Sequence, residues 1–215
     1  MKTSIYRILK DILKYKILGR KSDIHNSLLF LSLKPGTLAI DCGAHIGEAT
    51  EKMLNRGATV IGFEPNPHAC QAYRENYGDH PNLTILPKAV WTEKSKLRLY
   101  LHQNSDEDEV HWATGSSLLD TKANINREKW IEVEAVDFIH FLQELDQPVT
   151  LIKMDIEGAE CEVLEKLLDH GWHKKIGKIL VETHDDKIPE LKERTDQLRA
   201  RLKEEKIRNV ILDWI

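Results

Sequence analysis

The chain has 215 residues, a length that suits one domain with a small appendage. Its apolar content of 41% and charged content of 31% are typical of globular proteins, and a net charge of −4 gives no general attraction to nucleic acid. No apolar run approaches the roughly 18 residues of a membrane span, and the charged N-terminus lacks the apolar core of a secretory signal.

The three cysteines, Cys42, Cys70 and Cys161, are widely spaced and form no CxxC pair. This pattern predicts neither a disulfide framework nor a zinc site. We therefore expect a reduced, cytoplasmic setting.

Residues 4–18 predict a helix with one apolar face. Seven basic residues lie among the first 21: Lys2, Arg7, Lys10, Lys14, Lys16, Arg20 and Lys21. The helix could cover the core of the domain, or it could make a weak contact with an anionic membrane surface. We expect residues 1–34 to form a helical extension and residues 35–215 to form the single main domain.

After Pro35-Gly36, apolar runs of strand length alternate with helical patterns. Strands are predicted at 37–41, 59–63, 83–90, 149–154 and 178–182, and helices at 48–56, 68–77 and 159–168. Short strands that are apolar on both faces favour a parallel sheet between two helix layers. The prediction is a Rossmann-like, doubly wound α/β fold with a mostly parallel sheet.

Two further segments, 97–101 and 130–136, alternate apolar and polar residues and predict antiparallel partners. The stretch between them is polar and carries the acidic run 106–109, and it could be a solvated loop or a lid. Near the C-terminus, one face of a charged helix is marked by Ile188, Leu191, Leu198 and Leu202. A last strand is predicted at 209–215.

The segment 38–47, LAIDCGAHIG, predicts a strand, a glycine turn and a helix start. Its strand ends in Asp41, where a pyrophosphate-binding GxGxxG turn would have its first glycine. A carboxylate there favours a cofactor that carries an ammonium and a sulfonium group. A junction that binds no ligand is the alternative.

Glu64 closes the next predicted strand, about 20 residues further on, where a ribose-binding carboxylate is expected. Such a group can accept hydrogen bonds from both ribose hydroxyls. By itself Glu64 could be a surface residue at a strand end, but together with Asp41 it favours ribose binding.

The segment 151–160, LIKMDIEGAE, ends a strand on a cluster of charges. Lys153 and Asp155 share one face of the strand, and a buried lysine needs a carboxylate partner. Asp155, Glu157 and Glu160 gather at the carboxyl end, where doubly wound sheets bind ligands. A purely structural ion-pair network is the alternative.

The segment 180–184, LVETH, brings a histidine to the end of another strand. His184 could act as a general base for a hydroxyl nucleophile, although a structural role is the alternative. His45 in the glycine turn is a weaker candidate of the same kind.

Four motifs, IDCGAHIGEAT, GFEPNP, IKMDIEGAE and VETH, together resemble the FkbM family of methyltransferases. The resemblance extends over about residues 37–215 and is most specific at IKMDIEGAE. It implies a class I S-adenosylmethionine-dependent fold and transfer of a methyl group to an oxygen, often on a sugar or natural product. His45 and Cys42 depart from the family, which commonly has asparagine and valine there.

The resemblance also implies a set of site residues. The cofactor-binding residues would be Asp41, Gly43, Ala44, His45, Gly47, Glu64, Pro65, Ala89, Val90 and Asp155, with Ala89 and Val90 near the adenine. Asp155 and Glu157 would face the reaction centre, and Ser116 and Ser117 match a recurrent serine patch. We expect Asp155, Glu157 or His184 to be the catalytic base.

The sequence therefore predicts an S-adenosylmethionine-dependent O-methyltransferase with a small-molecule or glycan acceptor, no nucleic-acid partner and no assigned metal ligand. In a second interpretation, Asp155, Glu182 and His184 bind a divalent ion that activates the hydroxyl. A third interpretation is a domain that binds the cofactor without turnover. A nucleotide-dependent oxidoreductase is disfavoured by Asp41.

Overall fold

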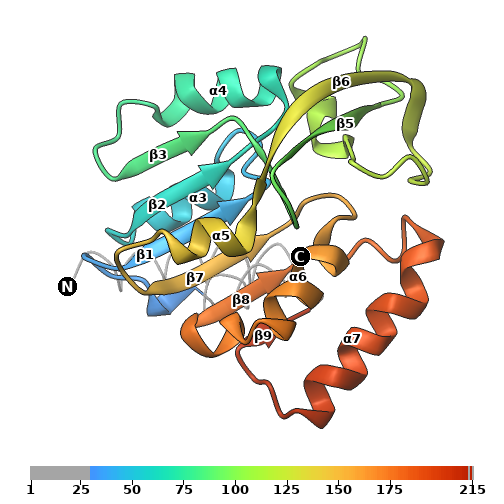
Figure 1. The fold of residues 1–215 in the computed structure, drawn as a ribbon. Coiled ribbons are helices and arrows are strands. Elements are labelled where there is room, and N and C mark those ends of the chain that lie inside the picture. Colours follow the sequence, from blue (N-terminus) through green and yellow to red (C-terminus); the bar gives the residue numbers. More distant parts are fainter. Residues whose placement is uncertain (1–29, 213, 215) are drawn as a thin grey trace, which may run out of the picture.

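A six-stranded sheet forms the centre of the computed structural model, which describes residues 30–212 and 214 (Figure 1). The strands lie in the order β3, β2, β1, β7, β8, β9, and all neighbouring pairs are parallel. They are β1 Leu38–Cys42, β2 Thr59–Phe63, β3 Leu83–Leu86, β7 Val149–Met154, β8 Lys178–Val181 and β9 Val210–Ile211. The strand order reverses between β1 and β7, so the turns after these two strands meet.

Helices bury both faces of this sheet, which confirms the predicted doubly wound fold. All five residues of β1 are buried, as expected for a strand between two helix layers. One apolar core packs the sheet against α5 Phe138–Gln143, α6 Glu160–Asp169 and α7 Lys192–Glu204. The opposite face carries α3 Glu48–Leu54, α4 Pro67–Tyr77 and the 3-10 helix η1 Phe30–Ser32.

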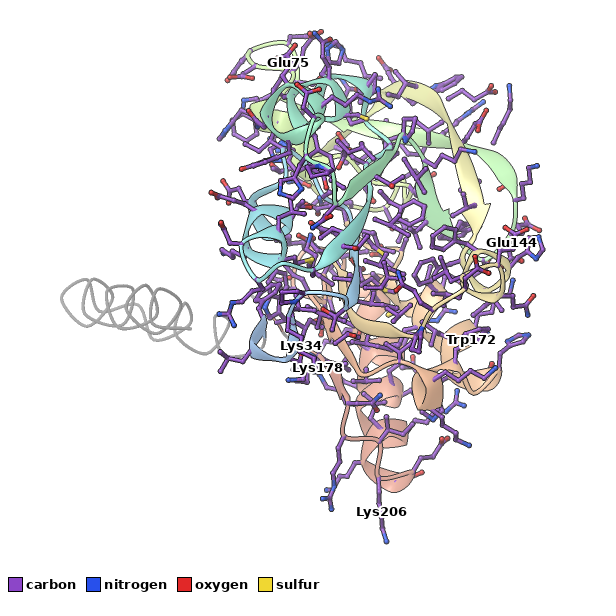
Figure 2. The ribbon with its side chains drawn as sticks, turned by 90° about the vertical axis from the view of Figure 1, so that its left-hand side faces the viewer. Lys34, Glu75, Glu144, Trp172, Lys178 and Lys206 are labelled. Atoms are coloured by element: carbon purple, nitrogen blue, oxygen red, sulfur yellow. The ribbon has the colours of Figure 1, made fainter. Side chains whose placement is uncertain are left out.

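The outer helices α4 and α7 lie near opposite edges of the sheet. Figure 2 shows Glu75 of α4 at one end of the molecule and Lys206, which follows α7, at the other. This arrangement follows from the strand order, since β3 and β9 are the two edge strands.

A second sheet of three strands adjoins the first. It contains β4 Ala89–Trp91, β5 Ser95–His102 and β6 Ile125–Asp137, in the order β4, β6, β5. Strands β5 and β6 are antiparallel, which confirms the pairing predicted for 97–101 and 130–136. The prediction of one strand over 83–90 was wrong, because the chain leaves the first sheet after β3 and β4 pairs with β6. Pro87 lies at this break, and proline has no N–H for a sheet hydrogen bond.

The helices predicted at 48–56, 68–77 and 159–168 are confirmed to within two residues at each end. The charged C-terminal helix is α7, preceded by the 3-10 helix η4 Pro189–Leu191, and a further 3-10 helix, η3 Trp172–Lys175, precedes β8. The strand predicted at 209–215 is shorter than expected, since β9 has two residues and pairs in parallel with β8. Within residues 30–212, no antiparallel strand extends this edge of the sheet.

The helix predicted at 4–18 lies outside the described residues, as does most of the predicted extension over 1–34. Among the helices that the structure describes, none is long and apolar enough to cross a bilayer. All three cysteines are free, and all three are buried.

Gly62 of β2 gives room for the ring of Tyr73 on α4. A Cβ atom at Gly62 would lie 2.2 Å from the Tyr73 hydroxyl. This hydroxyl lies 2.6 Å from Thr50 Oγ1, which donates a hydrogen bond to Asp41 Oδ2 at 2.7 Å. The missing side chain of Gly62 thus allows α4 to support the end of β1.

We expect Gly62→Ala to lower the free energy of unfolding by about 1–3 kcal/mol, because the added methyl group overpacks the space that Tyr73 occupies. Urea denaturation followed by tryptophan fluorescence measures this change. Gln71→Ala, at an exposed position of α4, is the control and should change stability by less than about 0.5 kcal/mol. Equal losses in the two variants would contradict the packing argument.

Candidate active site

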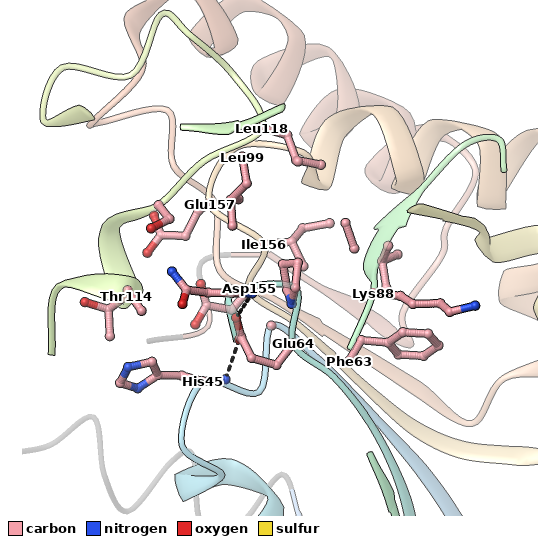
Figure 3. A pocket seen from close by; sticks show the side chains of 17 residues that line it. His45, Phe63, Glu64, Lys88, Leu99, Thr114, Leu118, Asp155, Ile156 and Glu157 are labelled. Atoms are coloured by element: carbon pink, nitrogen blue, oxygen red, sulfur yellow. Dashed lines mark hydrogen bonds between the residues drawn. The ribbon is translucent and has the colours of Figure 1, made fainter. Parts of the chain in front are cut away.

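A pocket of about 640 Å³, measured out to its open mouth, lies over the carboxyl ends of β1, β2 and β7. One part of its wall comes from the segment between β5 and β6, residues 103–124, which we call the lid segment. This segment contains the 3-10 helix η2 His111–Gly115. In Figure 3, Glu157 and Asp155 lie toward Thr114 of the lid segment, whereas Phe63 and Lys88 lie at the other end of the pocket. The pocket therefore has a charged end, where two carboxylates lie, and an opposite end where Phe63 lies beside Lys88.

Asp41 lies at the base of this site and is completely buried. Its Oδ2 atom accepts a hydrogen bond from Thr50 Oγ1, and its Oδ1 atom lies 3.5 Å from the ammonium group of Lys153. Burial raises the pKa of Asp41, and Lys153 acts in the opposite direction. The Oδ1 atom has no hydrogen-bond partner in the described part of the chain, so this carboxylate retains an unused acceptor.

The turn after β1 has the left-handed backbone that its glycines suggested. Gly43 has φ +75°, and a Cβ atom there would lie 1.8 Å from the carbonyl oxygen of Asp155. Only glycine can therefore occupy this position while the turns after β1 and β7 are in contact. His45 also has a positive φ, of 50°, although it is not a glycine.

Glu64 is buried against the same turn. Its two carboxylate oxygens accept hydrogen bonds from the backbone N–H groups of His45 and Asn66, both at 2.8 Å (Figure 3). Burial raises the pKa of Glu64 to about 7, although the two N–H donors act in the opposite direction. The carboxylate is held in a fixed position at the pocket wall, with lone pairs left for a ligand.

His45 links the turn to the lid segment. Its ring Nε2 lies 2.7 Å from the carbonyl oxygen of Val110. The sequence placed His45 at the cofactor and considered it as a base. In the structure its backbone N–H donates a hydrogen bond to Glu64, and its ring contacts Val110 of the lid segment.

The other predicted cofactor residues divide into two groups. Pro65, Ala89 and Val90 line the pocket together with Gly43, His45, Glu64 and Asp155. Asp41, Ala44 and Gly47 lie behind this wall and shape it. The structure thus brings the predicted set to one place, with three members in supporting positions.

The turn after β7 gathers the charges that the sequence indicated. Lys153 donates to the carbonyl oxygen of Gly43 at 2.7 Å and lies 3.2 Å from Asp155 Oδ2. Burial opposes its charge, but the carboxylates of Asp155 and Asp41 outweigh this effect and raise the pKa of Lys153. The lysine is thus a permanent cation that holds the two turns together.

Lys122 of the lid segment is a site residue that the sequence did not reveal. Its side chain is 1% exposed and forms an ion pair with Glu157 Oε2, and it also donates to the Gly115 carbonyl at 2.9 Å. Burial raises the pKa of Glu157, but the nearby His184 and Lys122 outweigh burial, so the net effect is a lowered pKa. No motif marks Lys122, because its role depends on how the lid segment folds back over β7.

His184 lies just after β8, with its ring buried among carboxylates. Nε2 is 3.1 Å from Glu157 Oε2, and Nδ1 is 3.0 Å from Glu160 Oε1. Burial disfavours the charged ring, but Glu157 and Glu160 outweigh it and raise the pKa of His184 to about 10. A ring that already holds its proton at neutral pH is a poor general base. Of the three candidate bases, Asp155 and Glu157 line the pocket. Asp155 is the less closely paired of the two, since it lies 3.2 Å from Lys153, whereas Glu157 lies 3.1 Å from His184 and also pairs with Lys122.

Comparison with known protein families decides the assignment. A family model described as the methyltransferase FkbM domain matches residues 41–208. The chain belongs to the FkbM methyltransferase family. The match runs from the end of β1 to the residues before β9, and therefore includes the whole candidate site described above.

The solved structures that match the chain include a methyltransferase FkbM and an rRNA methylase, both at low sequence identity. The methyltransferase FkbM from Methylobacillus flagellatus KT is 18% identical with a TM-score of 0.48, and the match covers 85% of this chain and 42% of that one. An rRNA methylase from Streptococcus thermophilus is 8% identical with a TM-score of 0.45, covering 86% of this chain and 79% of that one. This chain thus spans less than half of the Methylobacillus protein. No curated protein matches the chain by sequence.

We expect Lys153→Met to lower the free energy of unfolding by about 3–5 kcal/mol, because it leaves the buried carboxylate of Asp41 without its cation. Lys96→Met is the control, since Lys96 pairs with Glu132 on the exposed face of the second sheet. Urea denaturation should show a much smaller change for the control. An equal loss of unfolding free energy in both variants would show that Lys153 stabilises the protein no more than an exposed lysine does.

Proposed function

We propose that this FkbM-family methyltransferase binds S-adenosylmethionine in the pocket and methylates a hydroxyl oxygen of a sugar, glycan or small natural product. The observation that carries the proposal is the fixed carboxylate of Glu64 at the pocket wall. It lies beside the glycine turn after β1, at the point where the strand order reverses. Doubly wound sheets bind nucleotide cofactors at this point, with an acidic residue on the ribose.

The residues fit such a cofactor in three respects. Glu64 can accept hydrogen bonds from ribose hydroxyls, and the ion-paired group of Asp41, Lys153 and Asp155 has one more carboxylate than ammonium, which favours a cation nearby. Ala89, Val90 and Leu99 give the far end of the pocket an apolar wall suited to a flat base. The cofactor supplies an electrophilic methyl group when it is bound.

The charged end of the pocket supports transfer to oxygen. An alcohol becomes an effective nucleophile when its proton is accepted, and Asp155 lines the pocket with part of its side chain exposed. We assign Asp155 as the base: with the cofactor bound as methyl donor, Asp155 would accept the proton of the hydroxyl whose oxygen takes the methyl group. The remaining contribution of the protein is alignment of the two reactants.

The lid segment supports a neutral or cationic acceptor. The same segment carries the exposed residues Asp106, Glu107, Asp108 and Glu109, and these acidic side chains would repel a phosphate backbone that approached it. The three free cysteines fit a cytoplasmic reaction.

Glu64→Gln should weaken binding of S-adenosylhomocysteine by about 10- to 100-fold, because the charged acceptor for the ribose hydroxyls is lost. Isothermal titration measures this, with Glu132→Gln on the second sheet as the control. An unchanged affinity in folded Glu64→Gln would remove the ribose assignment.

The affinity of the unchanged protein should also depend on pH. Since the pKa of Glu64 is raised to about 7 and the ionised carboxylate is the better acceptor, affinity should rise from about pH 6 to about pH 8. Titration in buffers of different ionisation enthalpy should show release of protons near pH 6.5. Both effects should vanish in Glu64→Gln, and a pH slope that persists there would point to another group.

Asp155→Asn should lower kcat by about 10²- to 10⁴-fold while the Kd of S-adenosylhomocysteine changes only a few-fold. The assay is transfer of tritiated methyl from S-adenosylmethionine to a panel of sugars, glycans and polyhydroxylated small molecules. Loss of cofactor affinity in this variant would make Asp155 a binding residue. Tight cofactor binding without transfer to any acceptor of the panel would favour a non-catalytic module.

A further inference from the structure

Glu157 lines the pocket beside the proposed base and has no task in the methyl transfer described above. Its side chain is 19% exposed, and the two cations that pair with it, Lys122 and His184, both contact the same oxygen, Oε2. Among the residues that the structure describes, no hydrogen bond or ion pair reaches the other oxygen, Oε1. One oxygen of this carboxylate therefore keeps its lone pairs for a ligand.

The position of this carboxylate is fixed from both ends. The backbone of Glu157 has a φ of +57°, which is uncommon for a residue other than glycine, and its carbonyl oxygen accepts a hydrogen bond from Ser117 Oγ at 2.6 Å. Lys122 is anchored on the Gly115 carbonyl, and the other nitrogen of the His184 ring lies 3.0 Å from Glu160. A ligand can therefore use Oε1 without first having to order the side chain that carries it.

The charge of Glu157 suits binding and not proton transfer. Lys122 and His184 hold the pKa of this carboxyl below its ordinary value, so it stays ionised at neutral pH. The same two cations already balance its charge, so it has little attraction for a further cation. A neutral O–H donor keeps this balance and still gains a charge-assisted hydrogen bond.

Asp155 and Glu157 are close enough to hold one acceptor between them. An oxygen of one carboxylate lies within 4.8 Å of an oxygen of the other. Hydroxyls on adjacent carbons are near enough to each other that each can donate to one of these carboxylates, with donor–acceptor distances of about 2.7 Å. Thr114 of the lid segment lines the same end of the pocket and adds a further hydroxyl (Figure 3).

We propose that Glu157 selects acceptors with two hydroxyls on adjacent carbons, by binding the hydroxyl next to the one that is methylated. Asp155 accepts the proton of the reacting hydroxyl, while Glu157 Oε1 accepts a hydrogen bond from its neighbour and so orients the reacting oxygen. This role rests on the proposed methyl transfer and narrows its acceptors to vicinal diols. The product is a monomethyl ether in which the neighbouring hydroxyl is still free.

The test compares acceptors on the unchanged chain. Methyl glycosides of glucose, galactose, mannose and rhamnose are assayed with tritiated S-adenosylmethionine, and the methylated position is read from the product by NMR. Each accepted glycoside is then compared with the deoxy analogues that lack one hydroxyl on a carbon adjacent to that position. We expect kcat/KM to fall by about 10- to 100-fold for the analogue that lacks the hydroxyl bound by Glu157, because a hydrogen bond to a charged group is lost.

Glu157→Gln should remove most of this discrimination between the parent glycoside and its deoxy analogue. A general loss of structure would lower both rates in proportion, so the ratio of the two kcat/KM values separates a binding role from a folding role. Glu107→Gln, at an exposed acidic position of the lid segment, is the matched control and should keep the ratio of the unchanged chain. If Glu157→Gln does not fold, the comparison of acceptors on the unchanged chain decides the question.

The outcomes distinguish this role from the methyltransferase function. A ratio that is large in the unchanged chain and falls in Glu157→Gln supports the diol contact. If every deoxy analogue is methylated as well as its parent, or if Glu157→Gln leaves the ratio unchanged, the contact is overturned and the methyl transfer stands. Absence of transfer to any glycoside also overturns the contact, and titration with S-adenosylhomocysteine then shows whether the cofactor assignment stands without it.

Discussion

The ammonium group of Lys153 joins the two turns that form the base of the pocket, because it contacts the Gly43 carbonyl and lies between the carboxylates of Asp41 and Asp155. Lys153 and Asp41 are also register partners on adjacent strands, so the cation is placed by the sheet itself. Without it, two carboxylates would face each other in a region of low dielectric. The positions of Gly43, and through it of Glu64, therefore depend on this buried charge.

Around this centre the pocket separates two kinds of chemistry. At one end, apolar residues of β4 and β5 form a wall beside the fixed carboxylate of Glu64. At the other end, Glu157 is held between a lysine and a histidine, both nearly buried. The apolar wall with Glu64 suits the binding of a cofactor, whereas the end that contains Glu157 suits a reaction in which a proton is transferred. The division follows the strand order, since β2 and β4 build one end and β7 and β8 the other.

Much of the site could be predicted because the carboxyl ends of parallel strands converge. Asp41, Glu64 and Asp155 each close an apolar strand, and this feature is legible in sequence without any knowledge of the strand order. The second sheet was harder to predict. Pro87 signalled the break between β3 and β4, yet the apolar run 83–90 concealed it.

The parts that sequence could not supply are contacts between distant segments. Lys122 reaches Glu157 from 35 residues away, and nothing in its local pattern indicates burial. His184 was predicted as a base from its place after a strand. Its proton affinity is set by Glu157 and Glu160 across the turn, which the local sequence does not reveal. Such properties belong to the three-dimensional arrangement of charges and not to any one motif.

The lid segment has a double attachment to the site. Lys122 supplies a cation to Glu157, and Val110 receives the ring of His45, while Ser117 donates to the Glu157 carbonyl at 2.6 Å. The segment that forms part of the pocket wall therefore also balances the charge of Glu157. Replacing this segment without a cation at the position of Lys122 would leave Glu157 with His184 as its remaining cationic partner. A designed variant with a different lid segment therefore needs a cationic side chain beside Glu157, at the position that Lys122 now occupies.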